Sequence, residues 1–315
     1  MIDFAGEKIF ESATVDTNIL LFEKNAQNRG KTSCCIGTSD CRKDLSVFVK
    51  QTATPCAFTS SDSWVILSPI EQSIKRKIEA AGTPLKDWNI QINYGIKTGC
   101  NEAFIIDEAR RTEILSWCRD TAERKRTEQI IRPILRGRDI KRYAYEWAHL
   151  YIIATFPAKH LDIEDYPAVK NHLLSFGMER LEQTGREHLI NGKRIKSRKK
   201  SGNKWFETQD TISYMDDFDK PKIVWADLAR TGNAFIYDDG GFTSPNTTYL
   251  IASEDRTLLK YLIGVLNSKV ILKYLDWISA KLDETGWRWF KQYVETFPIP
   301  FTSKQQAKIA GLVCR

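Results

Sequence analysis

Three short apolar segments separated by turn residues, followed by a long apolar helical stripe, constrain the fold of this chain more than any other feature. The segments cover residues 223–226, 234–237 and 248–252, and short apolar runs bounded by turn residues are typical of β-strands. The stripe follows at residues 258–275, with Ser253 as the predicted N-cap. We therefore predict a mixed α/β (α+β) fold, with a twisted sheet, covering helices and a helical C-terminal part.

The composition supports a large core and excludes two classes of protein. Of the 315 residues, 42% are apolar and 11% aromatic, which rules out global disorder, and the length favours about two domains. Lysines interrupt the apolar stretch 258–275, so no run reaches the ~20 apolar residues of a membrane span. The N-terminal residues lack a signal-peptide pattern, and seven cysteines, an odd number, fit a reducing compartment. We expect a cytoplasmic protein with no membrane partner.

The N-terminal residues resemble a sheet edge followed by a connector. Residues 2–4 and 17–23 predict two short strands, the second of a buried type, which cannot bury both faces alone. Residues 25–63 are polar and are interpreted as a connector with one strand at 45–49. A capping box at Ser68 then predicts a helix that ends at Gly82. Its predicted buried stripe consists of Ile70, Ile74 and Ile78.

No complete catalytic site can be found in the sequence. The chain lacks a Walker-type phosphate loop, a dinucleotide-binding Gly fingerprint, a zinc-protease His pair and a Ser nucleophile elbow. No carboxylate set indicates a metal-dependent nuclease. Cys34, Cys35, Cys41 and Cys56 could hold zinc, but adjacent cysteines suit one ion poorly, and small apolar connector residues are the alternative. We predict no catalytic residue and no metal site.

The strongest anomaly of composition is a basic run at residues 193–204, where seven of twelve residues are basic and none is acidic. Like charges repel, so such a run is kept in a solvated loop or opposite anions such as DNA phosphates. Charge alone leaves both possibilities open. Trp205 could stack on a base or anchor the end of the loop in the core, and the anchor is favoured. The candidate phosphate contacts are Lys193, Arg194, Lys196, Arg198, Lys199, Lys200 and Lys204.

A second basic stretch occupies residues 132–143, with five Arg or Lys residues and one Asp. Arg136 and Arg138 flank a glycine, so a tight turn could present both guanidinium groups to phosphates or base edges. The alternative is that Asp139 pairs with one arginine and caps the turn. The candidate phosphate or base-edge contacts are Arg136, Arg138, Lys141 and Arg142.

A Gly-rich turn at residues 95–101 lies between predicted strands at 88–92 and 103–106. Its glycines and asparagine tolerate positive φ and could bring backbone N–H groups close to phosphate. An ordinary hairpin turn is the alternative, and the spacing alone favours it. The turn residues of interest are Gly95, Thr98, Gly99 and Asn101.

Five separated motifs, in order, resemble the TaqI-like C-terminal specificity domain. This domain is the target-recognition part of adenine-N6 DNA methyltransferases, including fused type IIG restriction-modification enzymes. The motifs are residues 94–106, the Arg-Gly-Arg-Asp segment at 134–140, residues 204–207 with 220–225, residues 262–268, and residues 297–300. The resemblance covers residues 64–300. Residues 2–20 are similar to the last portion of the family's methyltransferase domain.

The resemblance implies sequence-specific recognition of double-stranded DNA by residues 64–300. Residues 1–24 would be a methyltransferase remnant, 25–63 a connector, and 301–315 the start of a C-terminal helix. The family's Asn-Pro-Pro-Tyr motif and its S-adenosylmethionine loop are absent from the sequence. We therefore expect no cofactor in this chain, and expect S-adenosylmethionine on a methyltransferase domain of the same parent protein or of a separate subunit.

A different class of function stays open beside DNA recognition. The chain could be a specificity-subunit-like scaffold whose C-terminal helices, from Ser253 onward, dock a separate methyltransferase or nuclease subunit. An exposed apolar face on residues 258–275 would favour this alternative.

Overall fold

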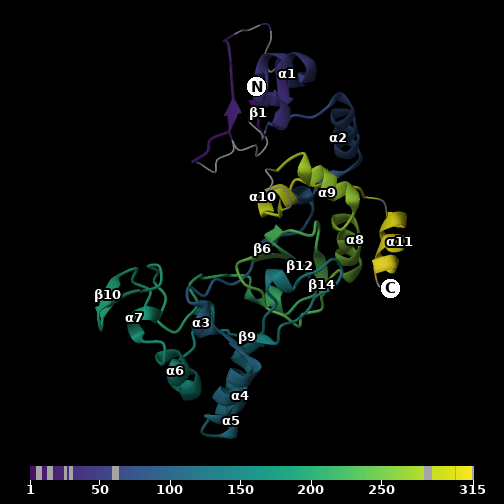
Figure 1. The fold of residues 1–315 in the computed structure, drawn as a ribbon. Helices are drawn as coiled ribbons and strands as arrows, with labels where there is room; N and C mark the ends of the chain where they lie inside the picture. Colours follow the sequence, from purple (N-terminus) through teal and green to yellow (C-terminus); the bar gives the residue numbers. More distant parts are fainter. Residues whose placement is uncertain are drawn as a thin grey trace.

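A four-stranded antiparallel sheet lies at the centre of the computed structural model, which describes residues 1–4, 9–12, 17–24, 27, 31–58, 64–279, 286–301 and 303–313 (Figure 1). The strand order is β14-β12-β15-β6. The strands are β6 (Ile92–Tyr94), β12 (Lys222–Ala226), β14 (Phe235–Asp238) and β15 (Thr248–Ala252). Val224 lies opposite Ile236 on one side and Leu250 on the other. The three strands predicted between residues 223 and 252 are confirmed.

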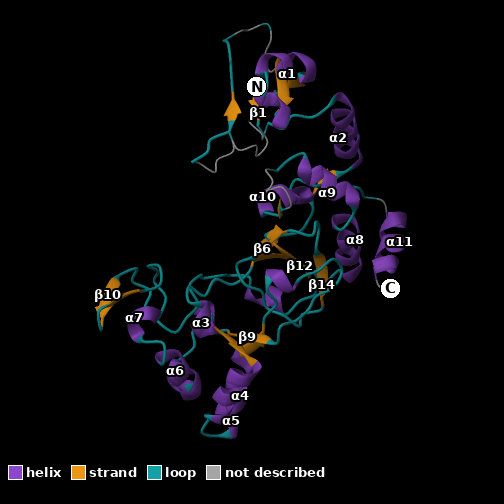
Figure 2. Ribbon diagram, in the orientation of Figure 1, coloured by secondary structure: helices purple, strands orange, loops and turns teal. Residues whose placement is uncertain are grey.

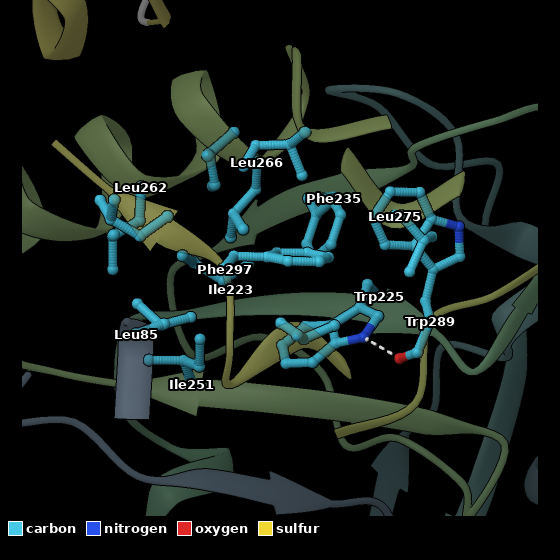
Figure 3. Close-up of a cluster of buried hydrophobic side chains, with 14 of the residues drawn as sticks. Leu85, Ile223, Trp225, Phe235, Ile251, Leu262, Leu266, Leu275, Trp289 and Phe297 are labelled. Atoms are coloured by element: carbon cyan, nitrogen blue, oxygen red, sulfur yellow. Dashed lines mark hydrogen bonds between the residues drawn. The ribbon is translucent and has the colours of Figure 1, made fainter. Parts of the chain in front are cut away.

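Both faces of the central sheet are buried, which explains why its strands read as continuous apolar runs. Every residue of β12 is buried. Ile223 and Trp225 pack into one core, whereas Val224 belongs to another. In the first core, Trp225 Nε1 donates to the Trp289 carbonyl oxygen at 2.9 Å (Figure 3). Around it lie Leu85, Phe235, Ile251, Leu262, Leu266, Leu275 and Phe297. Burial of each such side chain contributes roughly 1.5–3 kcal/mol.

Helices α8 (Arg256–Leu266) and α9 (Lys269–Asp276) supply much of this first core. The single helix predicted over 258–275 is therefore two helices, and its N-cap is Asp255, not Ser253. The break falls at Asn267, whose buried side chain pairs with the backbone of β14. Its Oδ1 accepts from Phe235 N–H at 3.0 Å, and its Nδ2 donates to the Phe235 carbonyl oxygen at 2.8 Å. These two bonds fix the end of α8 to the sheet.

The C-terminal helix α11 (Ser303–Val313) packs along α8, as predicted for a helix near residue 303 (Figure 1). Gly264 permits the close approach, because a Cβ there would lie 2.5 Å from Cγ2 of Ile309. The short helix α10 (Lys291–Val294) precedes it. Among the described residues, no helix combines the length and apolar character that crossing a membrane requires.

A second, three-stranded antiparallel sheet has the order β7-β9-β8. Its strands are β7 (Ile105–Asp107), β8 (Ile131–Pro133) and β9 (Leu150–Ile153). The helices beside it are α3 (Asn101–Phe104), α4 (Glu108–Ser116), α5 (Thr121–Ile130), α6 (Pro167–Leu174) and α7 (Met178–Leu181), with α4 and α5 extending beyond β9 in Figure 2. Helices α6 and α7 are separate because Gly177 between them adopts a positive φ of 85°.

The N-terminal part is more ordered than a connector and differs from the sequence prediction in two places. Its sheet, β2-β1-β3-β4, comprises β1 (Ile2–Asp3), β2 (Asn18–Ile19), β3 (Lys31–Ile36) and β4 (Thr54–Ala57). The strand predicted at 45–49 is wrong, because Asp44 caps a helix, α1 (Leu45–Thr52). The buried strand predicted at 17–23 is also wrong, since Leu21 and Phe22 are 83% and 90% exposed. Parts of the predicted remnant and connector, 5–8, 13–16, 25–26, 28–30 and 59–63, lie outside the described residues.

Helix α2 (Pro69–Ala81) has the predicted capping box at Ser68 but not the predicted buried stripe. Ile70 is 73% exposed and Ile74 is 44% exposed, whereas Ile78 packs against the first core. The helix is instead held by Glu71, which accepts from Trp277 Nε1 at 3.3 Å.

Short pairings and turns complete the framework. Strand β5 (Thr83–Pro84) pairs with β17 (Pro298–Ile299), and β13 (Leu228–Ala229) pairs with β16 (Trp287–Arg288). The 3-10 turns are η1 (Ser39–Arg42), η2 (Leu85–Asp87), η3 (Gly137–Asp139), η4 (Pro157–Lys159), η5 (Ile163–Asp165) and η6 (Met215–Phe218).

Candidate nucleic-acid interface

The first residues of the basic run 193–204 form one strand of a β-hairpin. Strand β10 (Glu187–Ile190) pairs antiparallel with β11 (Lys193–Lys196). Asn191 and Gly192 form the two-residue turn with φ of 49° and 75°, the left-handed pair that such hairpins require. The Asn-Gly dipeptide was the sequence signal for this hairpin. In Figure 1 the hairpin lies at the left edge of the molecule, beyond α3 and away from the central sheet.

Six of the seven predicted phosphate contacts are exposed, and we call them the basic hairpin surface. They are Lys193, Arg194, Lys196, Lys199, Lys200 and Lys204. Within the part of the chain that the structure describes, none of the six has an acidic partner. Lys204 alone has a ring contact, with its ammonium 5.4 Å from the Phe206 ring centroid. The six cations are therefore free to meet anions.

Arg198, the seventh candidate, is a structural residue, and the phosphate contact predicted for it is wrong. Its side chain is 2% exposed, and its guanidinium lies 5.0 Å from the Phe104 ring centroid. It donates to four backbone carbonyl oxygens, at 2.5–2.8 Å, from Thr98, Leu181, Trp205 and Glu207. Burial lowers the pKa of Arg198 to about 10, so it stays charged at neutral pH. Arg198 therefore anchors the hairpin to the protein.

The end of the basic run is also anchored, as favoured for Trp205 from the sequence. Trp205 packs against the second sheet's core and Phe206 is buried in it. Gln183 adds two bonds, from Nε2 to the carbonyl oxygens of Lys204 and Glu207, at 3.0 and 3.1 Å. The lysines between these anchors thus project from a fixed backbone.

A shallow hollow of about 510 Å³ opens beside the hairpin. It is lined by Gly99, Arg180, Arg194, Ile195, Lys196, Ser197, Arg198 and Lys199. Arg180 is half-buried and pairs with Glu102 at 2.8 Å, whereas Arg194, Lys196 and Lys199 have no acidic partner among the described residues. Arg180 was not predicted from the sequence, because it precedes the basic run and no local pattern connects the two. The exposed Arg194, Lys196 and Lys199 give the hollow the positive charge that attracts a phosphate group.

The Gly-rich turn joins the two sheets and is not the hairpin turn favoured from spacing. It leads from β6 into α3, so the strand predicted at 103–106 is helical as far as Phe104. Thr98 Oγ1 donates to Asn101 Oδ1 at 2.6 Å, and Thr98 Oγ1 also accepts from Cys100 N–H at 3.2 Å. These bonds hold the turn in shape.

Close packing accounts for both glycines of this turn. A Cβ at Gly95 would lie 2.0 Å from the Pro245 carbonyl oxygen, and one at Gly99, whose φ is 75°, would lie 2.5 Å from Gln209 Oε1. The Gly95 N–H group donates to the Thr248 carbonyl oxygen at 2.9 Å, so it is not available to phosphate. Only the Gly99 end of the turn borders the hollow.

The second basic group lies on other elements and is largely engaged by the protein. Arg136 pairs with Asp139 through Nε at 3.0 Å and Nη2 at 2.8 Å. This is the alternative given from the sequence, in which Asp139 pairs with one arginine and caps the turn. Arg142 donates to the Asn267 carbonyl oxygen at 2.6 Å, and Lys141 lies 3.8 Å from Glu146. Arg138 is exposed. Among the described residues, no hydrogen bond or ion pair joins this group to the basic hairpin surface.

The cysteine cluster belongs to the N-terminal core. Cys34, Cys35, Cys41 and Cys56 are buried and free. Burial raises the pKa of Cys34 to about 11, which disfavours the thiolate that zinc binds. In the described ranges, no group of three or more His, Cys, Asp or Glu residues could hold a metal ion.

Comparison with known families gives the class of protein to which this mixed α/β chain belongs, the specificity domains of a restriction-modification methyltransferase family. The family model of the TaqI-like C-terminal specificity domain matches residues 132–299, and the chain belongs to this family. The matched residues include the hairpin, the central strands β12, β14 and β15, and helices α8 and α9. The motif at 94–106, which contains the Gly-rich turn, precedes them.

The chain is similar to parts of larger methyltransferases and restriction enzymes. The chain is 24% identical over 243 residues to the type II methyltransferase M.PaeR7I of Pseudomonas aeruginosa, with 76% of this chain and 37% of that protein covered. The type IIL restriction-modification enzyme MmeI, solved in complex with DNA, matches with a TM-score of 0.50 at 14% identity, over 90% of this chain and 33% of MmeI. The type IIG restriction endonuclease BpuSI gives a TM-score of 0.49 at 8% identity, over 78% and 27%. The chain thus spans about a third of the length of these relatives.

Proposed function

We propose that this chain recognises a specific sequence in double-stranded DNA, as the specificity domain of an adenine-N6 methyltransferase in a restriction-modification system. The basic hairpin surface carries the proposal, because six exposed cations without acidic partners project from a backbone fixed by Arg198. Such cations release counterions when they meet phosphates. Membership of the specificity-domain family and the likeness to M.PaeR7I support the same reading.

The basic hairpin surface would set the position of the domain on the duplex through phosphate contacts. Phosphate contacts fix register but carry no sequence information, so base-edge contacts must come from other groups. Arg138, the exposed arginine of the second basic group, is our candidate, since an arginine fork fits the O6 and N7 acceptors of guanine. The target adenine would flip into a catalytic pocket outside this chain, where S-adenosylmethionine would bind.

Selection from a random-sequence duplex pool tests sequence-specific recognition. We expect the chain to enrich one short sequence, and we expect Arg138→Ala to relax the choice of base at one position of it. Binding without enrichment of any sequence would contradict the proposal. Titration calorimetry with S-adenosylmethionine should give no heat of binding, and measurable binding would show that this chain holds more than the recognition part.

The scaffold alternative loses its main support in the structure. The apolar faces of α8 and α9 are filled by the first core and by α11, and on these two helices only Val270, at 53%, stands among the exposed large apolar residues described. Docking of a separate subunit through this face would require α11 to leave. Since the described cysteines are free, we also propose a reducing, cytoplasmic setting.

A further inference from the structure

One exposed tyrosine in the second basic group has a backbone conformation that its side chain does not favour. Tyr143 has a φ of 63°, in the left-handed region, which is rare for a bulky residue. Its side chain is 47% exposed, so burial does not explain why a tyrosine stands there. Strained residues of this kind are found where a side chain must be presented for function.

Hydrogen bonds to β14 and to the end of α8 hold the backbone around Tyr143 in place. Its N–H group donates to the Phe235 carbonyl oxygen at 3.3 Å, and Phe235 is itself bound by the buried Asn267 side chain. The preceding residue, Arg142, donates to the Asn267 carbonyl oxygen at 2.6 Å. Both residues of the Arg142–Tyr143 pair are therefore tied to the junction between α8 and β14.

The Tyr143 ring is presented beside a cation. The Arg142 guanidinium carbon lies 5.4 Å from the ring centroid. Arg138, in the same segment, is exposed, whereas Lys141 lies 3.8 Å from Glu146. An exposed aromatic ring beside cations has the chemistry of a stacking platform for nucleic acids, because the ring stacks on a base while an exposed cation such as Arg138 attracts the adjoining phosphate.

We propose that Tyr143 stacks on an unpaired or unstacked nucleobase of the bound DNA, with Arg142 supporting the ring. This inference rests on the proposed function, and it assigns the second basic group a role distinct from that of the basic hairpin surface. The hairpin would bind the duplex backbone, and Tyr143 would contact a base that has left the stack.

Binding of a short single-stranded oligothymidylate to the full chain tests this proposal. Tyr143→Gly removes the ring and relieves the left-handed strain, so oligothymidylate should bind about tenfold more weakly while the thermal midpoint stays equal or rises. Tyr143→Phe keeps the ring and should retain most of the affinity. His160→Gly is the matched control, because His160 is also exposed with a φ of 48° but directly follows the separate turn η4 as its C-cap.

Three results would overturn the inference. The unchanged chain could fail to bind oligothymidylate, Tyr143→Gly could bind it normally, or Tyr143→Gly could lose thermal stability together with affinity, as a purely structural residue would. Duplex binding by Lys199→Ala with Lys200→Ala separates these failures from failure of the proposed function. If that variant binds duplex less well while the Tyr143 variants behave normally, the DNA proposal stands and the stacking role does not.

Discussion

Arg198 Nη1 donates to the Thr98 carbonyl oxygen at 2.8 Å, across a hundred residues of sequence. This bond ties the basic hairpin surface to the Gly-rich turn that joins the two sheets. The same nitrogen donates to Glu207, and the remaining guanidinium nitrogens bind Leu181 and Trp205. One arginine of the basic run thus binds backbone carbonyl groups inside the protein. These bonds hold the segment that carries the other six cations on the protein surface.

Removing this anchor should destabilise the protein strongly. Arg198→Met keeps the apolar stem but leaves four buried carbonyl groups without their donor, so we expect the free energy of unfolding to fall by about 3–5 kcal/mol. Urea denaturation measures the change. The exposed Lys196, two residues earlier, provides the control, because Lys196→Met should change stability by no more than about 0.5 kcal/mol. Equal effects of the two substitutions would contradict the anchoring role.

The junction of α8 with β14 should depend on one amide. Asn267→Ala removes both bonds to Phe235 and leaves the Phe235 N–H group unpaired, while the Phe235 carbonyl oxygen still accepts from Tyr143 N–H. The unfolding free energy should therefore fall by about 1–3 kcal/mol. Lys269→Ala, two residues on and exposed, is the control. If Asn267→Ala unfolded at the same urea concentration as Lys269→Ala, the two bonds to Phe235 would not hold this junction.

A buried histidine should make stability depend on pH. Burial lowers the pKa of His172, and its Nε2 lies 2.9 Å from the Ala103 carbonyl oxygen. Nearby Arg110 also lowers the pKa, while Glu113 raises it. Because the unfolded histidine takes up a proton first, at about pH 6.5, stability is fully present above that pH and is lost as the pH falls, by at most about 1.4 kcal/mol per pH unit.

His172→Gln removes this titration, which thermal unfolding at pH values from 7 to about 5 can measure. The protein with His172 should lose more stability between pH 7 and about pH 5 than the His172→Gln variant does. Parallel curves for the two proteins would show that His172 is not held neutral in the folded state.

The sequence predicted those parts of the fold that local patterns determine. The central strands were correct because burial on both faces leaves an unbroken apolar run, as in β12. The helix break at Asn267 was not predictable, since it depends on Phe235 in a distant strand. Ile70 matched an amphipathic pattern, yet its side chain is 73% exposed, because the contacts at that end of α2 are made by Glu71 to Trp277 and not by the apolar stripe.

The candidate site was predicted only in part. Composition identified the basic run, and the six exposed cations of the hairpin agree with it. Arg198 could not be distinguished from them, because its partners are backbone carbonyls that carry no sequence signature. The second basic stretch also looked available, but Arg136 is paired with Asp139. Tyr143 could not be singled out from the sequence, because its left-handed φ of 63° is a property of the folded backbone.

The salt dependence of DNA binding tests the central claim most directly. The claim is that the basic hairpin surface contacts phosphates, so Lys199→Ala with Lys200→Ala should make the slope of log affinity against log salt concentration shallower by about 0.9 for each lost contact. Lys77→Ala, an exposed lysine on α2, should leave the slope unchanged. An unchanged slope for the double variant, at undiminished affinity, would remove the hairpin from the interface and contradict the account.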